Sequence, residues 1–285
     1  MTPADIEPVS GAILADDWGD RRAWFEFAVS SPHIRTFVAE DARGAAIGTG
    51  VATINGPVAW IGTIWVAPPW RGQGVGRALT EAPIAAAEAA GCRTLVLVAT
   101  AAGQPLYERL GFAVQTWYHT MDAPPWSGPP DPSALAGSGP AARERRRRVR
   151  AWRPEDLDAM AALDLAATGE DRRHLLAAFA SPTGTLVVVG PDQVPRGFVI
   201  RAPWGGGATI APDIDDAFAL LAARRAAAGP GKRLRAGVVT SNIAGRARLE
   251  ADGWTEAWRA PRLVRGEPLD WRPTALWGQF NHAIG

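Results

Sequence analysis

The sequence has little of several features that mark specialised classes of protein. It has one cysteine, Cys92, in 285 residues, which excludes a framework of disulfides. Its formal net charge is +1, so no excess of one sign favours nucleic acid or a membrane surface. No window reaches the uninterrupted apolar length of a membrane span, and the first residues, Met1–Asp5, lack the basic and apolar regions of a signal peptide. We therefore expect a soluble cytoplasmic protein in which Cys92 has a structural role.

What the sequence does have is enough apolar residues for two cores, since 47% of its residues are hydrophobic. Its most informative stretch, 71–76, has the sequence Arg-Gly-Gln-Gly-Val-Gly and lies between the apolar run Ala59–Val66 and an expected helix that begins near Gly74. Alternate glycines allow a tight turn with converging N–H groups, and a helix N-terminus adds partial positive charge. The stretch predicts a cradle for phosphate or pyrophosphate, to which Arg71 and Arg77 could add charged contacts.

Three interpretations of this loop compete. A Walker A loop needs Gly-Lys followed by Ser or Thr, which is missing here. A dinucleotide fingerprint needs Gly-x-Gly-x-x-Gly directly after a strand and an acidic residue at the end of the next strand. Here the glycine spacing differs, and the next expected strand, which begins at Thr94, ends in Ala-Thr. The third interpretation is a glycine-rich turn before a surface helix.

The context of the loop adds a further observation. A stretch at 106–112, Leu-Tyr-Glu-Arg-Leu-Gly-Phe, follows the next expected strand. The order of strand, Arg-Gly-x-Gly-x-Gly loop, helix, strand, helix with Leu-Tyr, and Gly-Phe resembles the GNAT superfamily of acyl-CoA-dependent N-acyltransferases over residues 34–121. The resemblance implies a mixed α/β fold with a twisted, mostly antiparallel sheet, acetyl-CoA as co-substrate and no metal.

The resemblance also implies roles for particular residues. The loop amides would hold the pyrophosphate of coenzyme A, the backbone N–H near Val66 would bind the thioester carbonyl, and Tyr107 would be the general acid. For Tyr107 the alternative is an aromatic side chain that packs on the sheet. The implied cofactor-binding residues are Trp65, Val66, Arg71, Gly72, Gln73, Gly74, Val75, Gly76 and Arg77.

The general base is not evident. Many members of the family carry Glu or Asp on the strand before the loop, but residues 60–65 contain no ionisable group. Other candidates are Glu26, Glu40, Asp41, His33 and His119, and water that relays to a distant carboxylate is an equal alternative. Pro83 is a second departure, because proline inside the expected helix removes a hydrogen bond and should kink it.

The two halves of the sequence resemble each other. Asp-Arg-Arg begins a helical stretch at 20 and again at 171, each stretch ends before Ser-Pro, and a strand is expected after each, at 34–39 and 185–189. Pro68 and Pro212 occupy matching places, but the second copy replaces the glycine loop with Asp213-Ile214-Asp215-Asp216, whose carboxylates would repel a pyrophosphate. We predict tandem copies of one fold, the second without a cofactor site.

The expected organisation is a catalytic domain at 1–122, a linker rich in Pro, Gly and Arg at 123–146, and a degenerate GNAT-like domain at 147–285. The arginine run 143–148 is either a nucleic-acid or phospholipid contact or, as we favour, a solvated edge of the linker. The first copy lacks a clear opening strand, so that strand is irregular or strands are exchanged between the copies.

The sequence predicts an acetyl-CoA-dependent N-acetyltransferase that acts on a primary amine, with a small-molecule acceptor favoured over a charged peptide. The preference rests on the thirteen tryptophans, of which a few could line an aromatic acceptor pocket. The alternative is a non-catalytic acyl-CoA-binding or regulatory module. The sequence does not identify the acceptor.

Overall fold

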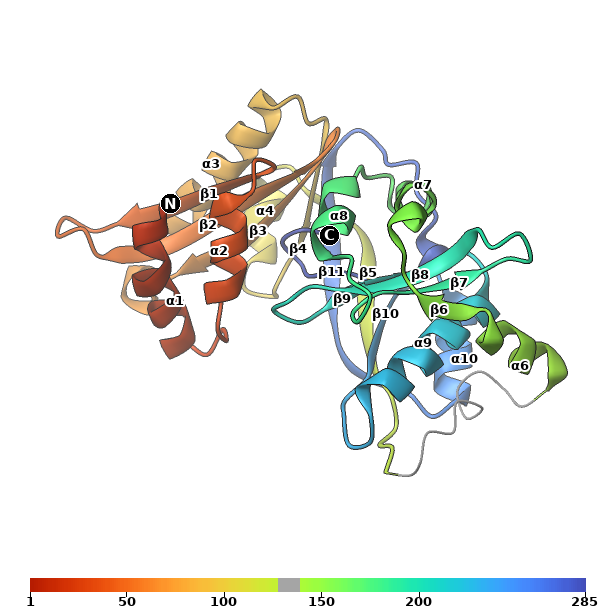
Figure 1. Cartoon of the computed structure of the whole chain (residues 1–285). Helices are drawn as coiled ribbons and strands as arrows, with labels where there is room; N and C mark the ends of the chain where they lie inside the picture. Colours follow the sequence, from red (N-terminus) through yellow and green to blue (C-terminus); the bar gives the residue numbers. More distant parts are fainter. Residues whose placement is uncertain (128–138) are drawn as a thin grey trace. The chain divides into compact units, whose positions relative to one another are not determined.

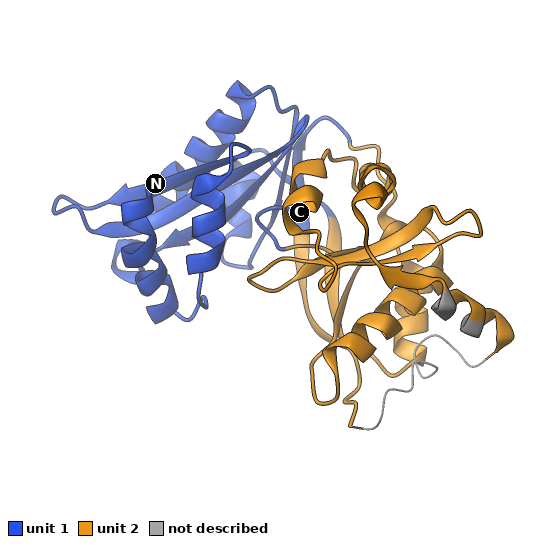
Figure 2. Ribbon diagram, viewed as in Figure 1, with its two compact units in different colours: residues 1–115, 262–268, 281–285 blue, residues 116–261, 269–280 orange. Residues whose placement is uncertain are grey.

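The computed structural model describes residues 1–127 and 139–285, apart from the side chains at 142, 143, 146 and 147. The chain folds into two compact units (Figure 2): unit 1 contains residues 1–115, 262–268 and 281–285, and unit 2 contains residues 116–261 and 269–280. Both units are therefore discontinuous along the chain, whereas the sequence led us to expect linear domains. Part of the expected linker, 128–138, lies outside the described residues.

Unit 1 consists of a sheet with helices on its faces (Figure 1). Its helices are α1 (Ile6–Ala15), α2 (Arg22–Ser30), α3 (Val75–Ala89) and α4 (Gln104–Arg109). Its strands are β1 (Ile34–Glu40), β2 (Ala46–Asn55), β3 (Val58–Val66) and β4 (Thr94–Val98), joined by parts of β5 (Ala113–Asp122) and β11 (Thr255–Gly266). A short 3-10 helix, α1 and α2 precede β1, which is the first strand among the described residues.

The core of unit 1 packs α3 closely on the sheet. Buried Leu95 and Leu97 of β4 pack with Ile84 of α3 and with Phe112. Pro83 lies inside α3, which is nevertheless one continuous helix. The carbonyl of Leu79, which Pro83 cannot pair, lies directly over Gly50 of β2, where a side chain would collide with it. Gly50 thus allows the helix to approach the strand.

Unit 2 has the same kinds of element. Its helices are α6 (Pro140–Arg147), α7 (Leu157–Thr168), α8 (Arg173–Phe179), α9 (Ile214–Ala228) and α10 (Ile243–Ala251). Its strands are β6 (Val149–Ala151), β7 (Leu186–Val189), β8 (Pro195–Arg201), β9 (Gly207–Ile210), β10 (Arg235–Val239) and β12 (Leu276–Gly278), joined by the remainder of β5 and β11. Five of these strands form one sheet in the order β12-β9-β8-β7-β6.

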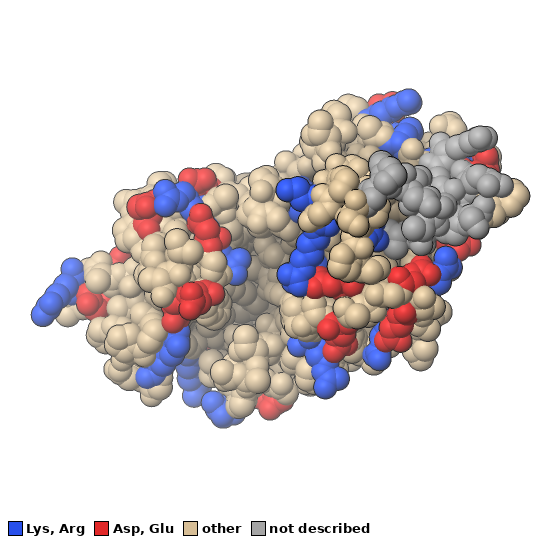
Figure 3. All heavy atoms as spheres, turned by 90° about the horizontal axis from the view of Figure 1, so that it is seen from below, with Lys and Arg blue, Asp and Glu red and all other residues tan. Residues whose placement is uncertain are grey.

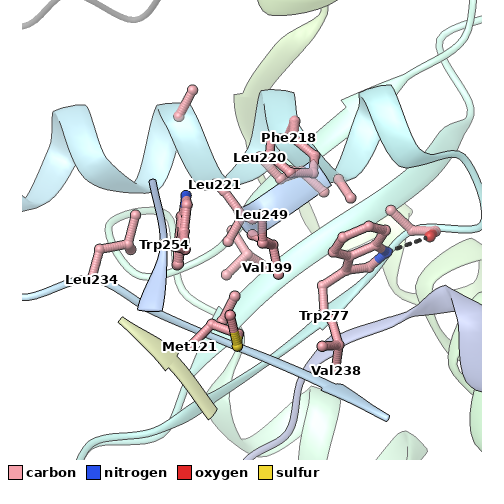
Figure 4. Close-up of a cluster of buried hydrophobic side chains, with 14 of the residues drawn as sticks. Met121, Val199, Phe218, Leu220, Leu221, Leu234, Val238, Leu249, Trp254 and Trp277 are labelled. Carbon is pink, nitrogen blue, oxygen red and sulfur yellow. Dashed lines mark hydrogen bonds between the residues drawn. The ribbon is translucent and has the colours of Figure 1, made fainter. Parts of the chain in front are cut away.

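The core of unit 2 lies between α9, α10 and the strands (Figure 4). Phe218 of α9, Leu249 of α10 and Val238 of β10 gather around Trp277 of β12, and Phe218 meets Trp277 edge to face at 5.7 Å between ring centroids. The indole Nε1 of Trp277 donates to the carbonyl of Ala211 at 3.0 Å, so its polar atom is satisfied inside the core. A strand from the far end of the chain is therefore part of this core.

Strands are exchanged between the two halves of the sequence. The last strand of the first copy, β5, pairs with β10, where Tyr118 lies opposite Val239. The corresponding strand of the second copy, β11, pairs with β4, where Arg262 lies opposite Val98. The hydrogen-bonded order of the larger sheet is β1-β2-β3-β4-β11-β5-β10. From the sequence, exchange of strands was one of two alternatives, and an irregular opening strand in the first copy was the other.

Charged side chains of both signs are interspersed on the face shown in Figure 3. Within the arginine run, Arg145 pairs with Asp215 at 2.8 Å, and the guanidinium of Arg148 donates to the carbonyl of Val189 at 3.4 Å. These two arginines are thus bound within unit 2. None of the helices formed by residues 1–127 and 139–285 is long and apolar enough to cross a bilayer.

Candidate active site

The candidate site in unit 1 begins where two parallel strands separate. The parallel pairing of β3 with β4 ends at Trp60 and Val96, although β3 continues to Val66. A bulge lies in this part of β3, because two of its residues, Thr63 and Ile64, face one position of β2, and Thr63 has a φ of 51°. A bulge bends its strand, here without ending the pairing of β3 with β2. The carboxyl-terminal part of β3 therefore leaves β4 and exposes its own edge.

The backbone of Val66 is directed towards that edge. Ala67 donates its N–H to the carbonyl of Ile47 at 2.8 Å, so these two residues form a hydrogen-bonded pair of the antiparallel ladder. Successive residues of such a ladder alternate in direction, and Val66, opposite Gly48, therefore points its N–H and carbonyl away from β2. This N–H is available to a carbonyl oxygen placed between β3 and β4.

The glycine loop after β3 presents unpaired amides. Gly72 and Gly74 have positive φ values of 76° and 87°, and a Cβ at either position would meet nothing within 4 Å. Gly74 is the N-cap of α3, and no side chain caps that helix. The first amides of α3 thus lack intrahelical partners and a side-chain cap, and the space around Gly72 and Gly74 is open, as an anion site requires.

The side chains around this loop already have partners. Arg71 pairs with Asp16 and donates from Nε to the carbonyl of Val66 at 2.9 Å. Arg77 pairs with Glu81 at 2.8 Å on the exposed face of α3. Gln73 donates to the carbonyl of Pro69 at 2.8 Å, which holds the turn. The anion site therefore depends on backbone amides, and both arginines would have to leave a carboxylate in order to assist.

Tyr107 lies on α4, the helix that directly follows β4. Its side chain is 9% exposed and packs edge to face on Phe112, with 6.3 Å between ring centroids. Burial raises the pKa of Tyr107 to about 12, so the phenol keeps its proton at neutral pH. Because β3 and β4 are parallel, their carboxyl ends lie at the same edge of the sheet, and the glycine loop and α4 follow at that edge.

The base candidates named from the sequence do not reach this edge. Asp41 holds the β1–β2 turn, where it accepts from the N–H groups of Arg43 and Ala45 at 2.8 and 2.9 Å. Glu40 and His33 lie at the ends of β1, which β2 separates from β3. Glu26 is exposed on α2.

His119, the remaining candidate, lies in unit 2. It is buried between strands, with Nδ1 2.6 Å from Glu256 and Nε2 2.9 Å from Thr240. Its hydrogen bonds lower the pKa of Glu256, which Arg259 and Arg246 also favour as an anion. Both ring nitrogens of His119 are thus engaged in a cross-strand network.

One acidic residue that the sequence analysis did not single out does lie at the end of β3. Asp16 is the C-cap of α1, and its carboxylate accepts from the indole Nε1 of Trp65 at 2.8 Å and pairs with Arg71. Three acidic residues within five positions, 16–20, mark this loop in the sequence. Their contact with β3 is long-range, so local sequence gave no signal for it.

In unit 2 the matching loop is capped by its own carboxylate. Asp213 is the N-cap of α9, and its Oδ1 accepts from the N–H groups of Asp215 and Asp216 at 2.9 and 3.0 Å. Burial, followed by the charge of Asp213, raises the pKa of Asp216. The amides that an anion would use are therefore occupied by Asp213. The repulsion between these carboxylates and a pyrophosphate, expected from the sequence, adds to this effect.

The strand edge that matches the β3 edge is also occupied. β12 pairs with β9, where Leu276 lies opposite Ile210 and Ala211 donates to the carbonyl of Ala275 at 2.9 Å. The other side of β12 faces β10, where a Cβ on Gly237 would lie 3.6 Å from Gly278. Leu249 lies four residues before Gly253, just as Tyr107 lies four residues before Gly111, so a leucine takes the place of the tyrosine in the second copy. Unit 2 thus lacks both the gap beside its strand and a counterpart of Tyr107.

Two further groups bear on the chemistry. Cys92 is buried, and burial raises the pKa of its thiol, which favours a packing role over a nucleophile. Across residues 1–127 and 139–285, no cluster of three or more His, Cys, Asp or Glu side chains is placed to hold a metal ion.

Comparison with known proteins concerns the family and the fold of the chain. Residues 7–112 match the model of the Acetyltransferase (GNAT) family. A search of curated protein sequences found no match. The matched segment contains the glycine loop and Tyr107 and ends at Phe112, within unit 1.

Solved structures resemble the chain over its whole length. An acetyltransferase-like protein from Pyrococcus horikoshii is 17% identical, with a TM-score of 0.78 over 100% of this chain and 94% of its own. A GCN5-related N-acetyltransferase from Sphaerobacter thermophilus is 16% identical, with a TM-score of 0.60 over 95% and 96%. A tandem GNAT protein from the clavulanic acid biosynthesis pathway is 14% identical, with a TM-score of 0.60 over 93% and 96%.

At these identities the likeness concerns the fold. Residues 7–112 match the GNAT family model, and the chain as a whole has the fold of tandem GNAT proteins. The mixed α/β fold and the tandem GNAT architecture predicted from the sequence are confirmed.

Proposed function

We propose that the protein is an acetyl-CoA-dependent N-acetyltransferase that acetylates a primary amine, with a small-molecule acceptor, and that its site lies in unit 1. The observation that carries the proposal is the N–H of Val66, which points into the gap between β3 and β4 next to the uncapped N-terminus of α3. A thioester carbonyl and a pyrophosphate need these two kinds of donor.

The residues of unit 1 supply most of the chemistry of acyl transfer. The N–H of Val66 would stabilise the oxyanion that forms when the amine attacks the thioester carbon. As the C–N bond forms and the C–S bond breaks, the Tyr107 hydroxyl would donate to the leaving sulfur. A pKa of about 12 makes Tyr107 a weaker acid than a thiol, whose pKa is about 8.5, so we expect hydrogen-bond donation rather than complete proton transfer.

A non-catalytic acyl-CoA-binding module is the second candidate, because β3 carries no ionisable side chain. The two candidates differ in whether free coenzyme A thiol is released. We expect release when the protein is mixed with acetyl-CoA and a panel of primary amines, and loss of release in Tyr107→Phe. Binding of acetyl-CoA without thiol release from any amine would favour the non-catalytic module.

A further inference from the structure

The carboxylate of Asp16 is held in place by two donors from β3 and the glycine loop. Its Oδ2 accepts from the indole Nε1 of Trp65 at 2.8 Å and from Nη2 of Arg71. The side chain of Asp16 is 17% exposed, whereas that of Arg71 is 51% exposed. The carboxylate is thus held by the buried indole, and the guanidinium is its solvent-facing partner.

Asp16 lies one guanidinium group away from the proposed reaction centre. Arg71 binds Asp16 through Nη2 and the carbonyl of Val66 through Nε. Side chains alternate along β3: the Val66 side chain lies 3.6 Å from the position of a Cβ on Gly76 of α3, whereas the Trp65 side chain reaches the end of α1. Asp16 is therefore on the face of β3 opposite α3.

We propose that Asp16 binds the ammonium group of the acceptor and takes up its proton, and that Arg71 couples this role to the coenzyme. The inference rests on the proposed function and names the base that the sequence left open. Asp16 is the C-cap of α1, and the partial negative charge of a helix C-terminus favours a cation beside this carboxylate. Arg71 supplies that cation in this structure, and an alkylammonium group has the same charge.

Two protons leave the nitrogen when an ammonium group becomes an amide, and Asp16 takes up one of them. The carboxylate takes the first from the ammonium group, which frees the nitrogen lone pair to attack the thioester carbon. The C–N bond forms, the C–S bond breaks, and the second proton leaves nitrogen for the departing sulfur beside Tyr107. The products are the amide, the thiol and a protonated Asp16 that returns its proton to water.

The coupling follows from the two roles open to Arg71. Its guanidinium can pair with Asp16 or with a phosphate bound at the amides of the glycine loop, and phosphate offers two oxygens to the guanidinium fork. A move of Arg71 to the phosphate leaves Asp16 without its cation, so the carboxylate is open to the ammonium group of the acceptor. We therefore expect the coenzyme to bind before the amine.

The test compares Asp16→Asn with wild type in two measurements. Asparagine can still accept from Trp65 but has no charge. With 2-phenylethylamine, which is charged at neutral pH, we expect turnover at saturating acetyl-CoA to fall roughly 10²-fold. With its isomer 4-ethylaniline, which is uncharged, we expect a much smaller loss. A better alkylamine from the panel and its aryl isomer can replace this pair. Equal losses with both isomers, or no loss, would overturn the role of Asp16 as proton acceptor.

The second measurement is acetyl-CoA affinity by calorimetry, which needs no turnover. Release of Arg71 from a half-exposed ion pair should tighten binding roughly two- to fivefold in Asp16→Asn. Unchanged or weaker binding contradicts the coupling. Asp17→Asn is the matched control, because Asp17 is exposed and adjacent, and we expect wild-type values. Asp16→Glu should restore part of the activity. Failure of the proposed function itself is distinct, since it shows in the wild-type protein as the absence of thiol release with every amine.

Discussion

Tyr107 is both a buried packing residue and the proposed hydrogen-bond donor to the leaving sulfur. Tyr107→Phe keeps the ring that packs on Phe112 and removes the hydroxyl. If the hydroxyl stabilises the leaving sulfur, turnover should fall roughly 10²-fold with little change in acetyl-CoA affinity. Single-turnover kinetics are the appropriate measurement, because they isolate the chemical step from product release. An unchanged chemical step would leave Tyr107 with its packing role only.

The pKa of Tyr107 adds a constraint on the pH profile. Because burial raises it to about 12, the hydroxyl stays protonated across the usual assay range. Deprotonation of Tyr107 should therefore cause no fall in rate up to about pH 10. A basic limb at lower pH that disappears in Tyr107→Phe would contradict this environment for the phenol.

His282 gives unit 1 a dependence of stability on pH. Burial, together with the nearby charge of Arg21, lowers its pKa from 6.5 to about 4. Between these values the unfolded chain binds a proton that the folded chain does not, so the free energy of unfolding falls as pH drops below 6.5. From pH 7 to pH 5 this loss should be about 2 kcal/mol.

The measurement is denaturant unfolding of wild type and His282→Gln at pH 7 and pH 5. Other groups titrate in both proteins, so the informative quantity is the difference between their pH dependences. We expect wild type to lose about 2 kcal/mol more than the variant. Equal losses would mean that His282 is not held neutral in the folded protein.

At the scale of elements, the role of the uncapped N-terminus of α3 in anion binding can be tested by giving α3 an acidic N-cap like that of α9. Gly74→Asp would place a carboxylate at the N-cap, as Asp213 does in unit 2. The new carboxylate should take the α3 amides and repel phosphate, and acetyl-CoA binding should weaken by roughly 10²-fold or more. Gly74→Asn is the matched control, since it has the same shape and backbone strain but no charge. Similar affinities for the two variants would remove charge from the explanation.

Local elements were predictable from the sequence because their signals are local. The glycine loop, the strand before it and the helix after it are found where expected, with β3 at Val58–Val66 and α3 from Val75. The partners of each strand were not predictable. The exchange of β5 and β11 depends on pairings such as Arg262 with Val98, which no short-range pattern specifies. The contact of Asp16 with Trp65 was missed for the same reason.

The exchange of strands predicts how the halves behave when they are separated. In unit 1, β11 covers the edge of β4, and the carbonyls of Ala283 and Ile284 accept from Thr53 and Asn55 of β2. A fragment of residues 1–127 loses these partners and exposes the apolar edge of its sheet, so we expect it to be insoluble alone. Co-expression with residues 139–285 should restore a soluble complex, measured by co-purification through a tag on one fragment. A soluble fragment 1–127 with cooperative unfolding would contradict the exchange.

At the scale of the whole molecule, the same fold is used in two ways. Unit 1 leaves a strand edge and a helix N-terminus open, whereas unit 2 fills both with its own residues, β12 at the edge and Asp213 at the helix. The sequence indicated only the carboxylates. Residues 276–278 form a very short strand with no periodicity of their own, so their insertion beside β9 could not be read from local pattern.

This difference predicts one acetyl-CoA site per chain. Titration of wild type should saturate at one equivalent, and Gly74→Asp should leave no site of comparable affinity. A sharper test neutralises the carboxylates of unit 2 together, with Asp213→Asn, Asp215→Asn and Asp216→Asn. If charge alone closed this unit, a second equivalent would then bind. Because β12 still lies along β9 and Trp277 anchors it in the core, we expect the stoichiometry to stay at one. A second equivalent in this variant, or one that survives in Gly74→Asp, would show that unit 2 retains a coenzyme site.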